Sequence, residues 1–258
     1  MTTTTFATGI GMGESARWHR GRLWLCDWVA GEVLAFSPAG DREVVTRVEG
    51  VPFSVDWLPD GRLVVCTSDG VRVGPGLEPY GALGRPWNEI AVGPEGHVFV
   101  DMPGSMPWED PAPGVVAVVR PDGSSDVVAG GLAFPNGLAV VDGGATLLVA
   151  ESHAARLTAF TVGADGSLTD RRVWADLGDG AAPDGICVGT DGTVWYADVP
   201  NAHCRRVAEG GEVLATVPLG SGAFSCALGG DDGRTLFAVV GDWDGHGVTN
   251  GRVLATPV

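Results

Sequence analysis

The sequence predicts an all-β fold: a single six-bladed β-propeller domain that spans residues 1–258 and is closed by its N-terminal strand. Three observations lead to this prediction. A hairpin pattern occurs six times, and its copies are 34 to 48 residues apart. The last repeat unit is one strand short, and the N-terminal segment can supply that strand. Periods of this length with four strands per unit are typical of propeller blades.

Each repeat has a polar residue at or near its start, follows an apolar strand to a Gly-containing turn, and returns along a second apolar strand to another polar group. Such turns between short apolar runs are typical of β-hairpins. The repeats cover residues 14–27, 54–68, 88–101, 134–153, 184–198 and 225–242. Their polar lead residues are separated by 40, 34, 48, 48 and 41 positions.

Two more strands are expected after most hairpins, which completes four strands per blade. They are predicted at 31–36 and 43–48, 114–120 and 126–128, 156–161 and 171–176, and 204–208 and 213–218. From Ser225 to the end only 34 residues remain, enough for three strands. Residues 2–11 can provide the fourth, which would close the ring and remove an exposed sheet edge.

The composition excludes several classes of function. The formal net charge is −16 and the sequence has no Lys, so binding to nucleic acid or to an anionic membrane is disfavoured and Schiff-base chemistry is absent. No apolar stretch reaches membrane-spanning length, and the N-terminus has no signal-peptide pattern. Five Cys without C-x-x-C spacing fit a reducing cytoplasm. We therefore expect a cytoplasmic protein whose partner is a small-molecule substrate; its oligomeric state is not predicted.

The six lead residues suggest a cation site. In a propeller the innermost strands surround a central channel and begin at one mouth of it, so these residues should gather there. They are Glu14, Ser54, Asn88, Asn136, Asp184 and Ser225. All present oxygen, which favours hard cations such as Ca²⁺ or Mg²⁺, with Mn²⁺ tolerated. The alternative is that each only caps a tight turn, as Pro-Asn-Gly and Pro-Asp-Gly strings do.

The hairpins return the chain to the same mouth, where a second ring of side chains could line a substrate site. These return residues are Asp27, Trp28, Thr67, Ser68, Asp101, Met102, Glu151, Ser152, His153, Asp198, Asp242 and Trp243. His153 is the His of this rim nearest a lead residue, and is a candidate acid or base or a structural residue.

Two long segments, 74–87 and 102–114, are expected to lie over the mouth as binding loops. Their Trp87 and Trp108 would be an apolar substrate wall or packing anchors. Other catalytic signatures are absent: the sequence has no G-x-S-x-G, P-loop, H-E-x-x-H or EF-hand pattern. Ser54 and Ser225 lack an evident base and are set aside as nucleophiles.

Four motifs resemble the SMP-30/gluconolactonase/LRE-like family. They are Gly-Glu-Ser at 13–15, Trp-Asn at 87–88, Phe-Pro-Asn-Gly at 134–137 and Pro-Asp-Gly at 183–185, in order over nearly the whole chain. The resemblance implies a six-bladed propeller that binds one divalent cation, usually Ca²⁺ or Zn²⁺, at the channel mouth. It also implies hydrolysis of sugar-acid or other lactones, with organophosphate hydrolysis in relatives.

By the same resemblance, Glu14, Asn136 and Asp184 are the metal ligands, Asp184 is also the general base, and Asn88 contacts the substrate or approaches the metal. Ca²⁺ is the first expectation, with Zn²⁺, Mg²⁺ and Mn²⁺ as alternatives. One position departs from the sugar-lactonase pattern: Pro86 stands where an Arg is expected, with Arg85 one residue earlier. This departure favours a less polar substrate than a sugar-acid lactone.

The leading hypothesis is therefore a metal-dependent hydrolase of a lactone or ester, in which the cation polarises the carbonyl and Asp184 acts as general base. Two alternatives stay open. One is a metal-containing propeller enzyme of another reaction class that acts on a hydrophobic metabolite. The other is a binding propeller without catalysis, in which the cation is structural.

Overall fold

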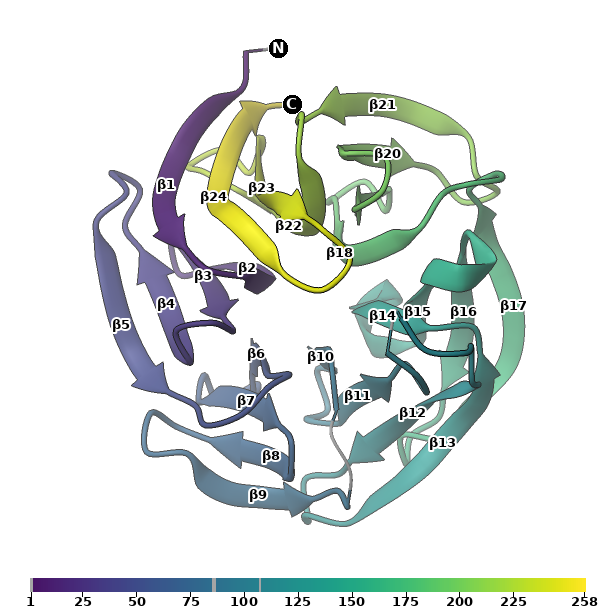
Figure 1. Cartoon of the computed structure of the whole chain (residues 1–258). Helices are drawn as coiled ribbons and strands as arrows, with labels where there is room; N and C mark the ends of the chain where they lie inside the picture. The colour runs from purple at the N-terminus through teal and green to yellow at the C-terminus, as the bar shows by residue number, and fades with distance from the viewer. Residues whose placement is uncertain (1, 85–86, 107) are drawn as a thin grey trace.

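The computed structural model describes residues 2–84, 87–106 and 108–258. In it six four-stranded antiparallel sheets stand around one axis like the blades of a propeller (Figure 1). Five blades are continuous in sequence, and the sixth combines strands from both ends of the chain. This arrangement confirms the predicted fold class.

The strands have the same roles in every blade, from the axis outward. The innermost strands are β2 (Gly13–His19), β6 (Ser54–Trp57), β10 (Ile90–Val92), β14 (Pro135–Val141), β18 (Pro183–Val188) and β22 (Gly222–Gly229). The second strands are β3 (Arg22–Asp27), β7 (Leu63–Thr67), β11 (Val98–Met102), β15 (Thr146–Glu151), β19 (Val194–Asp198) and β23 (Thr235–Trp243). The third strands are β4 (Glu32–Phe36), β8 (Gly70–Val73), β12 (Gly114–Val119), β16 (Arg156–Val162), β20 (His203–Val207) and β24 (Val248–Pro257). The outer strands are β5 (Arg42–Arg47), β9 (Glu78–Ala82), β13 (Ser125–Leu132), β17 (Leu168–Asp176), β21 (Val213–Pro218) and, in blade 6, β1 (Thr4–Ile10).

The hydrophobic core is divided among the contacts between neighbouring blades. Six clusters of buried apolar side chains occur in the described part of the chain, one for each pair of adjacent blades, including the pair formed by blades 6 and 1. The second and third strands pack against blades on both sides, and β4, β7 and β19 are buried at every residue. The outer strands face solvent on one side and alternate less strictly, as in β5.

Ring closure follows the prediction from residue counts. β1 pairs antiparallel with β24, from Thr4 opposite Ala255 to Ile10 opposite Gly251. The two chain ends therefore lie close together at the outer edge of one blade (Figure 1). Pairing β1 with β24 satisfies the edge of β24, which would otherwise be exposed.

One sequence-based expectation is wrong. Segment 74–87 was expected to be a long loop, but it contains β9, the outer strand of blade 2. The sequence Glu-Pro-Tyr-Gly-Ala of β9 carries Pro and Gly, which are rare in strands, and an outer strand tolerates them because it pairs on one side only. The helices of the described residues are two single 3₁₀ turns, η1 (Asp142–Gly144) and η2 (Ser152–Ala154). Neither is long or apolar enough to cross a membrane.

Candidate functional site

The polar lead residues lie where the inner strands begin, at one end of the ring that we call the mouth face. Glu14, Asn136 and Asp184 are the second residues of β2, β14 and β18, and Asn88 lies two residues before β10. The structure therefore brings together, from four of the six blades, the residues that the sequence selected.

Bulges in two inner strands set the direction of the candidate ligands. Asn136 and Gly137 form the irregular part of β14, and Asp184 and Gly185 that of β18. Bulges re-aim side chains and are frequent next to active sites. A β-carbon at Gly137 would lie 2.4 Å from the carbonyl oxygen of Asp184, so this glycine allows blades 4 and 5 to approach closely at the site. The Pro-Asn-Gly string is thus more than a turn.

Glu14 and Asp184 are buried carboxylates with unfavourable electrostatics. Their residues are 8 and 9% exposed. Burial, followed by the nearby charges of Asp184 and Glu89, raises the pKa of Glu14 well above its usual range. Burial and the charge of Glu89 likewise raise the pKa of Asp184. In the described part of the chain neither carboxylate forms an ion pair with an Arg. Such an uncompensated pair marks a candidate functional site.

The two amides orient one of these carboxylates. The Asn88 Nδ2 donates a hydrogen bond to Asn136 Oδ1 over 3.1 Å. The Asn136 side chain in turn hydrogen-bonds to Asp184, which lowers the pKa of Asp184 but does not cancel the effect of burial. A chain of contacts therefore runs from blade 3 through blade 4 to blade 5.

A further carboxylate that the sequence analysis did not single out, Glu89, lies beside this cluster. Its Oε1 accepts hydrogen bonds from Ser15 Oγ at 2.9 Å, from Arg17 Nη2 at 3.1 Å and from the backbone N–H of Ile90 at 2.9 Å. Arg17 comes from blade 1 and also donates to the carbonyl of Ile90 in blade 3. A polar residue next to Asn88, just before a buried apolar strand, was the available signal in the sequence.

Ser15 explains why the Gly-Glu-Ser motif needs its third residue. Ser15 has a φ of 53° and lies in a bulge of β2. Its hydroxyl contacts Glu89 and also accepts a hydrogen bond from the backbone N–H of Val55 at 3.0 Å, which joins blades 1, 2 and 3. The bulge also changes the alternation of β2, so that Arg17 reaches across to blade 3.

The remaining lead residues differ in their contacts. Ser225 Oγ accepts a hydrogen bond from the backbone N–H of Ala16 at 2.9 Å, which ties blade 6 to blade 1. Ser54 Oγ is buried beside the Cys66 thiol. Oδ2 of Asp101 is buried and has no hydrogen-bond partner among the described residues. Burial raises the pKa of Asp101 well above its usual range, and the charges of Glu89 and Asp184 contribute. Asp101 is thus a fourth acidic group near the cluster, after Glu14, Asp184 and Glu89.

Two of the return carboxylates, Asp27 and Asp198, hydrogen-bond to the backbone of turns. Asp27 accepts hydrogen bonds from the backbone N–H groups of Gly11, Val29 and Ala30. Asp198 serves the backbone N–H groups of Ala182 and Asn201 in the same way. These contacts explain why a carboxylate follows several second strands without requiring a role in chemistry.

The predicted substrate-wall residues have three different environments. His153 is exposed, and its ring lies 4.4 Å from that of Phe134 between centroids. Trp87 is 2% exposed and packs in the core between blades 2 and 3, in the place of a packing anchor. Trp108 is 52% exposed and lies 6.0 Å from His246 between ring centroids. Pro86 and Arg85 lie outside the described residues.

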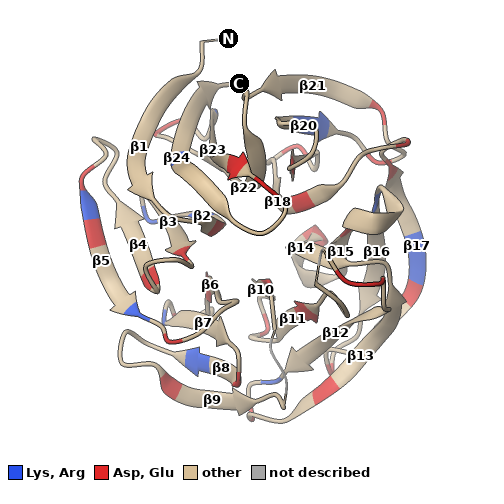
Figure 2. Cartoon of the chain, in the orientation of Figure 1, with Lys and Arg blue, Asp and Glu red and all other residues tan. Residues whose placement is uncertain are grey.

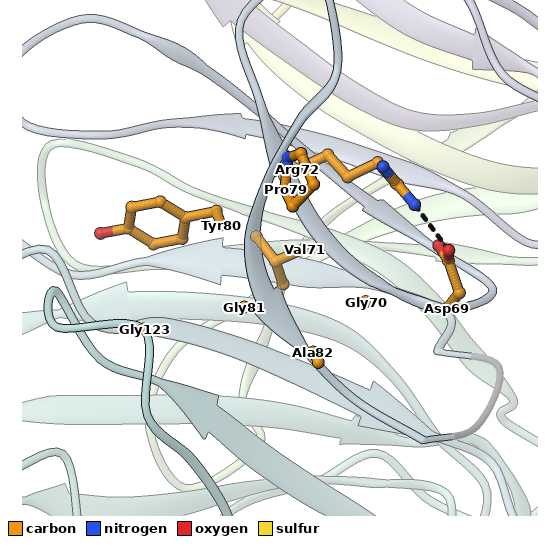
Figure 3. A pocket seen from close by; sticks show the side chains of 9 residues that line it. All are labelled: Asp69, Gly70, Val71, Arg72, Pro79, Tyr80, Gly81, Ala82 and Gly123. Atoms are coloured by element: carbon orange, nitrogen blue, oxygen red, sulfur yellow. Dashed lines mark hydrogen bonds and ion pairs between the residues drawn. The ribbon is translucent and has the colours of Figure 1, made fainter.

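Two cavities of the structure lie away from this cluster. One, of about 310 Å³, is at the edge of blade 2, where Tyr80, Arg72 and Asp69 line it (Figure 3). The other, of about 470 Å³, is lined by Trp57, Pro94 and other residues of the turns at the opposite end of the ring. The first is held by an Arg72–Asp69 ion pair of 2.6 Å and carries no group with the character of the Glu14–Asp184 pair.

The mouth cluster fits a divalent cation by its chemistry. Among the described residues, no three His, Cys, Asp or Glu side chains come close enough to hold a metal by themselves. The candidate set instead combines two carboxylates, Glu14 and Asp184, with the amides of Asn136 and Asn88. Oxygen sets of this kind suit Ca²⁺ or Mg²⁺, and a cation would compensate the burial and the repulsion that raise both carboxyl pKa values.

The sequence profile of the SMP-30/Gluconolactonase/LRE-like region matches residues 12–241. The chain belongs to this family. The match runs from just before Glu14 to the end of the sixth hairpin, so it includes every residue of the mouth cluster. A comparison with curated protein sequences finds no match.

Several solved structures share the fold of this chain. A gluconolactonase from Xanthomonas campestris has a TM-score of 0.77 at 24% identity, over 99% of this chain and 89% of that one. A luciferin-regenerating enzyme has a TM-score of 0.82 at 17% identity, over 100 and 95%. A calcium-binding regucalcin from Agrobacterium tumefaciens has 0.78 at 18% identity, over 96 and 90%. At these identities the likeness establishes the fold.

Proposed function

We propose that the protein is a divalent-cation-dependent hydrolase of a lactone or carboxylic ester. The observation that carries the proposal is the buried Glu14–Asp184 pair at the mouth face, which has raised pKa values and no Arg partner in the described structure. A protein would gain nothing in stability from such a pair without a ligand. The names of similar proteins, a gluconolactonase and a calcium-binding regucalcin, agree with a lactone substrate and a cation.

Glu14, Asn136 and Asp184 would hold the cation, with Ca²⁺ first and Zn²⁺, Mg²⁺ or Mn²⁺ as alternatives. When bound, the cation supplies Lewis-acid polarisation of the substrate carbonyl and stabilises the negative charge that develops on its oxygen. Asn88 lies beside Asn136, where its amide orients the substrate.

Asp184 is suited to move the proton. Burial favours proton uptake by the Asp184 carboxylate, and a bound cation would offset part of this effect. Asp184 takes the proton of a water molecule as the water oxygen bonds to the carbonyl carbon. The ring or ester C–O bond then breaks, and the same proton passes to the departing alkoxide oxygen. The products are an alcohol and a carboxylic acid, which releases its remaining proton to solvent and becomes a carboxylate; the two are joined in one chain when the substrate is a lactone.

The test separates cation binding from catalysis. Purified protein is analysed for metal and then titrated with Ca²⁺, Zn²⁺, Mg²⁺ or Mn²⁺, while thermal stability and hydrolysis of a lactone panel are followed separately. We expect hydrolysis only with cation bound. The Asp184→Asn variant should lose both cation binding and hydrolysis. Asp191→Asn is a matched control, because Asp191 lies in the turn at the other end of the same hairpin.

Other outcomes would favour the alternatives. Hydrolysis that survives in fully metal-stripped protein would contradict the proposal. Cation binding that stabilises the fold without turnover of any lactone or ester would favour a binding propeller with a structural cation, or an enzyme of another reaction class.

A further inference from the structure

Trp108 and His246 meet above the mouth face. Trp108 belongs to the loop after β11 in blade 3, and His246 to the loop after β23 in blade 6. The blades follow one another in sequence order around the ring, so blades 3 and 6 stand on opposite sides of it. Two loops from opposite blades can touch only across the axis. The 6.0 Å ring contact therefore spans the face on which the cluster lies.

Figure 1 agrees with this geometry, since the β23–β24 loop extends from blade 6 toward the centre of the ring. The contact is not part of the hydrophobic core. Trp108 remains 52% exposed, and the rings are tilted by 48° rather than stacked. A large aromatic surface is thus left available beside the axis.

The exposed large apolar side chains that lie in described loops are all at this end of the ring. Of the large hydrophobic side chains that are exposed in the described structure, five lie on outer strands, where one face is solvated. The others all lie in loops at the mouth face: Val29, Val51, Met106 and Trp108. Met106 and Trp108 lie two residues apart in one of these loops, and exposed apolar side chains beside a polar site are typical of a ligand-binding surface.

The charges of the mouth face disfavour an anionic substrate. The loops that connect strands at this end contain no Arg in their described residues, and the chain has no Lys. They carry carboxylates instead, including Glu109, Asp110 and Asp244. Arg side chains occur on outer and third strands such as β5, β8, β17 and β20 (Figure 2). Within the described loops an anionic substrate would meet carboxylates and no Arg, so these loops would repel it and the carboxylate product.

We propose that Trp108 and His246 form an aromatic bridge over the mouth that binds the apolar substituent of a neutral lactone or ester. This inference rests on the proposed function and specifies its substrate class. Trp108 is the principal specificity residue, and the neighbouring Met106 extends its apolar surface. The polar cluster beneath would take the carbonyl end of the same molecule.

The test uses lactones with one ring size and n-alkyl side chains of increasing length, compared with a hydroxylated lactone of the same ring. In cation-loaded wild-type protein, kcat/KM should rise with chain length. Trp108→Ala should lose about tenfold in kcat/KM for the longest chain, because it removes part of the apolar contact area. It should leave the hydroxylated lactone nearly unchanged. Val127→Ala is the matched control, since Val127 is 56% exposed on outer strand β13.

Binding of the corresponding alkyl lactams, measured by calorimetry, provides a readout without turnover. Chain-length-dependent binding that Trp108→Ala weakens and Val127→Ala does not would support the bridge, even if no lactone were hydrolysed and the proposed function failed. Preference for the hydroxylated lactone, or a chain-length dependence that Trp108→Ala leaves intact, would overturn the bridge while hydrolysis itself stood.

Discussion

Glu151 and the Glu14–Asp184 pair are buried carboxylates at the same end of the ring, but their surroundings differ. Glu151 is fully buried and receives hydrogen bonds from Arg156, Arg171, Thr158 and the backbone N–H of Ala133. Burial alone would raise its pKa, but the hydrogen bonds outweigh burial and lower the pKa from 4.5 to about 2. The pKa values of Glu14 and Asp184 move in the opposite direction, because no Arg in the described structure compensates their burial and because acidic neighbours add repulsion.

The difference separates two uses of a buried charge. Glu151 is neutralised by ion pairs with Arg156 and Arg171. Through Arg171 it joins the second strand of blade 4, β15, to the outer strand, β17. Glu14 and Asp184 lack such a partner in the described structure, so their compensation must come from a bound ligand or a proton. The experiments below test this difference by removing a charge or a contact and measuring cation affinity, activity and stability.

The largest effect is expected for Glu14→Gln, which keeps the shape of the side chain and removes its charge. Hydrolysis should fall by on the order of 10³-fold, and cation affinity should fall with it. The cation-free protein should be no less stable than the wild type, because one of the repelling charges is gone. Isothermal titration with Ca²⁺ and thermal unfolding with chelator measure these quantities. A variant that kept wild-type affinity would remove Glu14 from the ligand set.

Glu151→Gln should show the converse behaviour. It leaves Arg156 and Arg171 without their counter-charge and should lower the free energy of unfolding by about 3 kcal/mol. Cation affinity and kcat/KM should stay near wild type. Glu209→Gln is the control, since the exposed Arg172–Glu209 pair of 2.8 Å should contribute less than about 1 kcal/mol. Denaturant titration distinguishes the two, and a strong loss of cation affinity in Glu151→Gln would erase the contrast between the sites.

The lowered pKa of Glu151 determines how its contribution to stability depends on pH. The pKa of Glu151 is lower in the folded protein, so the unfolded chain binds the proton more readily as the pH falls. The stabilisation by Glu151 is complete above pH 4.5 and is lost as the pH approaches 2. The loss should amount to about 3 kcal/mol. Unfolding curves across this range should converge for wild type and Glu151→Gln; parallel curves would contradict the assignment.

A smaller effect is expected for Asn88→Ala. Without its amide, Asn136 loses the 3.1 Å contact that orients it, and cation affinity should weaken by about tenfold. Asn201→Ala is a suitable control because the Asn201 amide contacts Asp198 and the carbonyl of Gly180. Competition with a Ca²⁺ chelator gives both affinities. Equal losses in the two variants would indicate a general effect on stability.

The smallest effect is expected for His153→Ala. The ring is exposed and rests on Phe134, so kcat/KM should change by less than about threefold, within the range of a surface substitution. A loss of a hundredfold or a changed pH profile of kcat/KM would instead make His153 part of the chemistry.

Much of the fold could be predicted because the six hairpins recur at similar spacings in the sequence. The hairpins, their polar lead residues and the closure by the N-terminal strand all followed from spacing and turn composition. The outer strand β9 was not predicted, because Pro79 and Gly81 weaken the strand pattern of its sequence. Its pairing with β8 depends on the folded structure. The lead residues Glu14, Asn88, Asn136 and Asp184 were predicted to gather, and the structure places them in contact or close enough for their charges to interact.

Other parts of the site depend on features that no spacing encodes. The bulge at Ser15 shifts the alternation of β2, and this shift lets Arg17 reach Glu89 in blade 3. The contact between Trp108 and His246 joins loops separated by 138 positions, and it requires the ring to be closed before the two can meet. The sequence identified Trp108 as a candidate, but its partner depends on which blades stand opposite each other.

The pairing of β1 with β24 has a mechanical consequence. Because the strands are antiparallel, both chain ends lie at the same end of the ladder, at Thr4 and Ala255. A force that separates the two termini would break this ladder one rung at a time, from Thr4 toward Ile10, instead of shearing all its hydrogen bonds together. The opening would then reach Gly13 and Glu14 of β2 last. Pulling the two termini apart would therefore detach the N-terminal strand at low force while the candidate cation ligands were still in place.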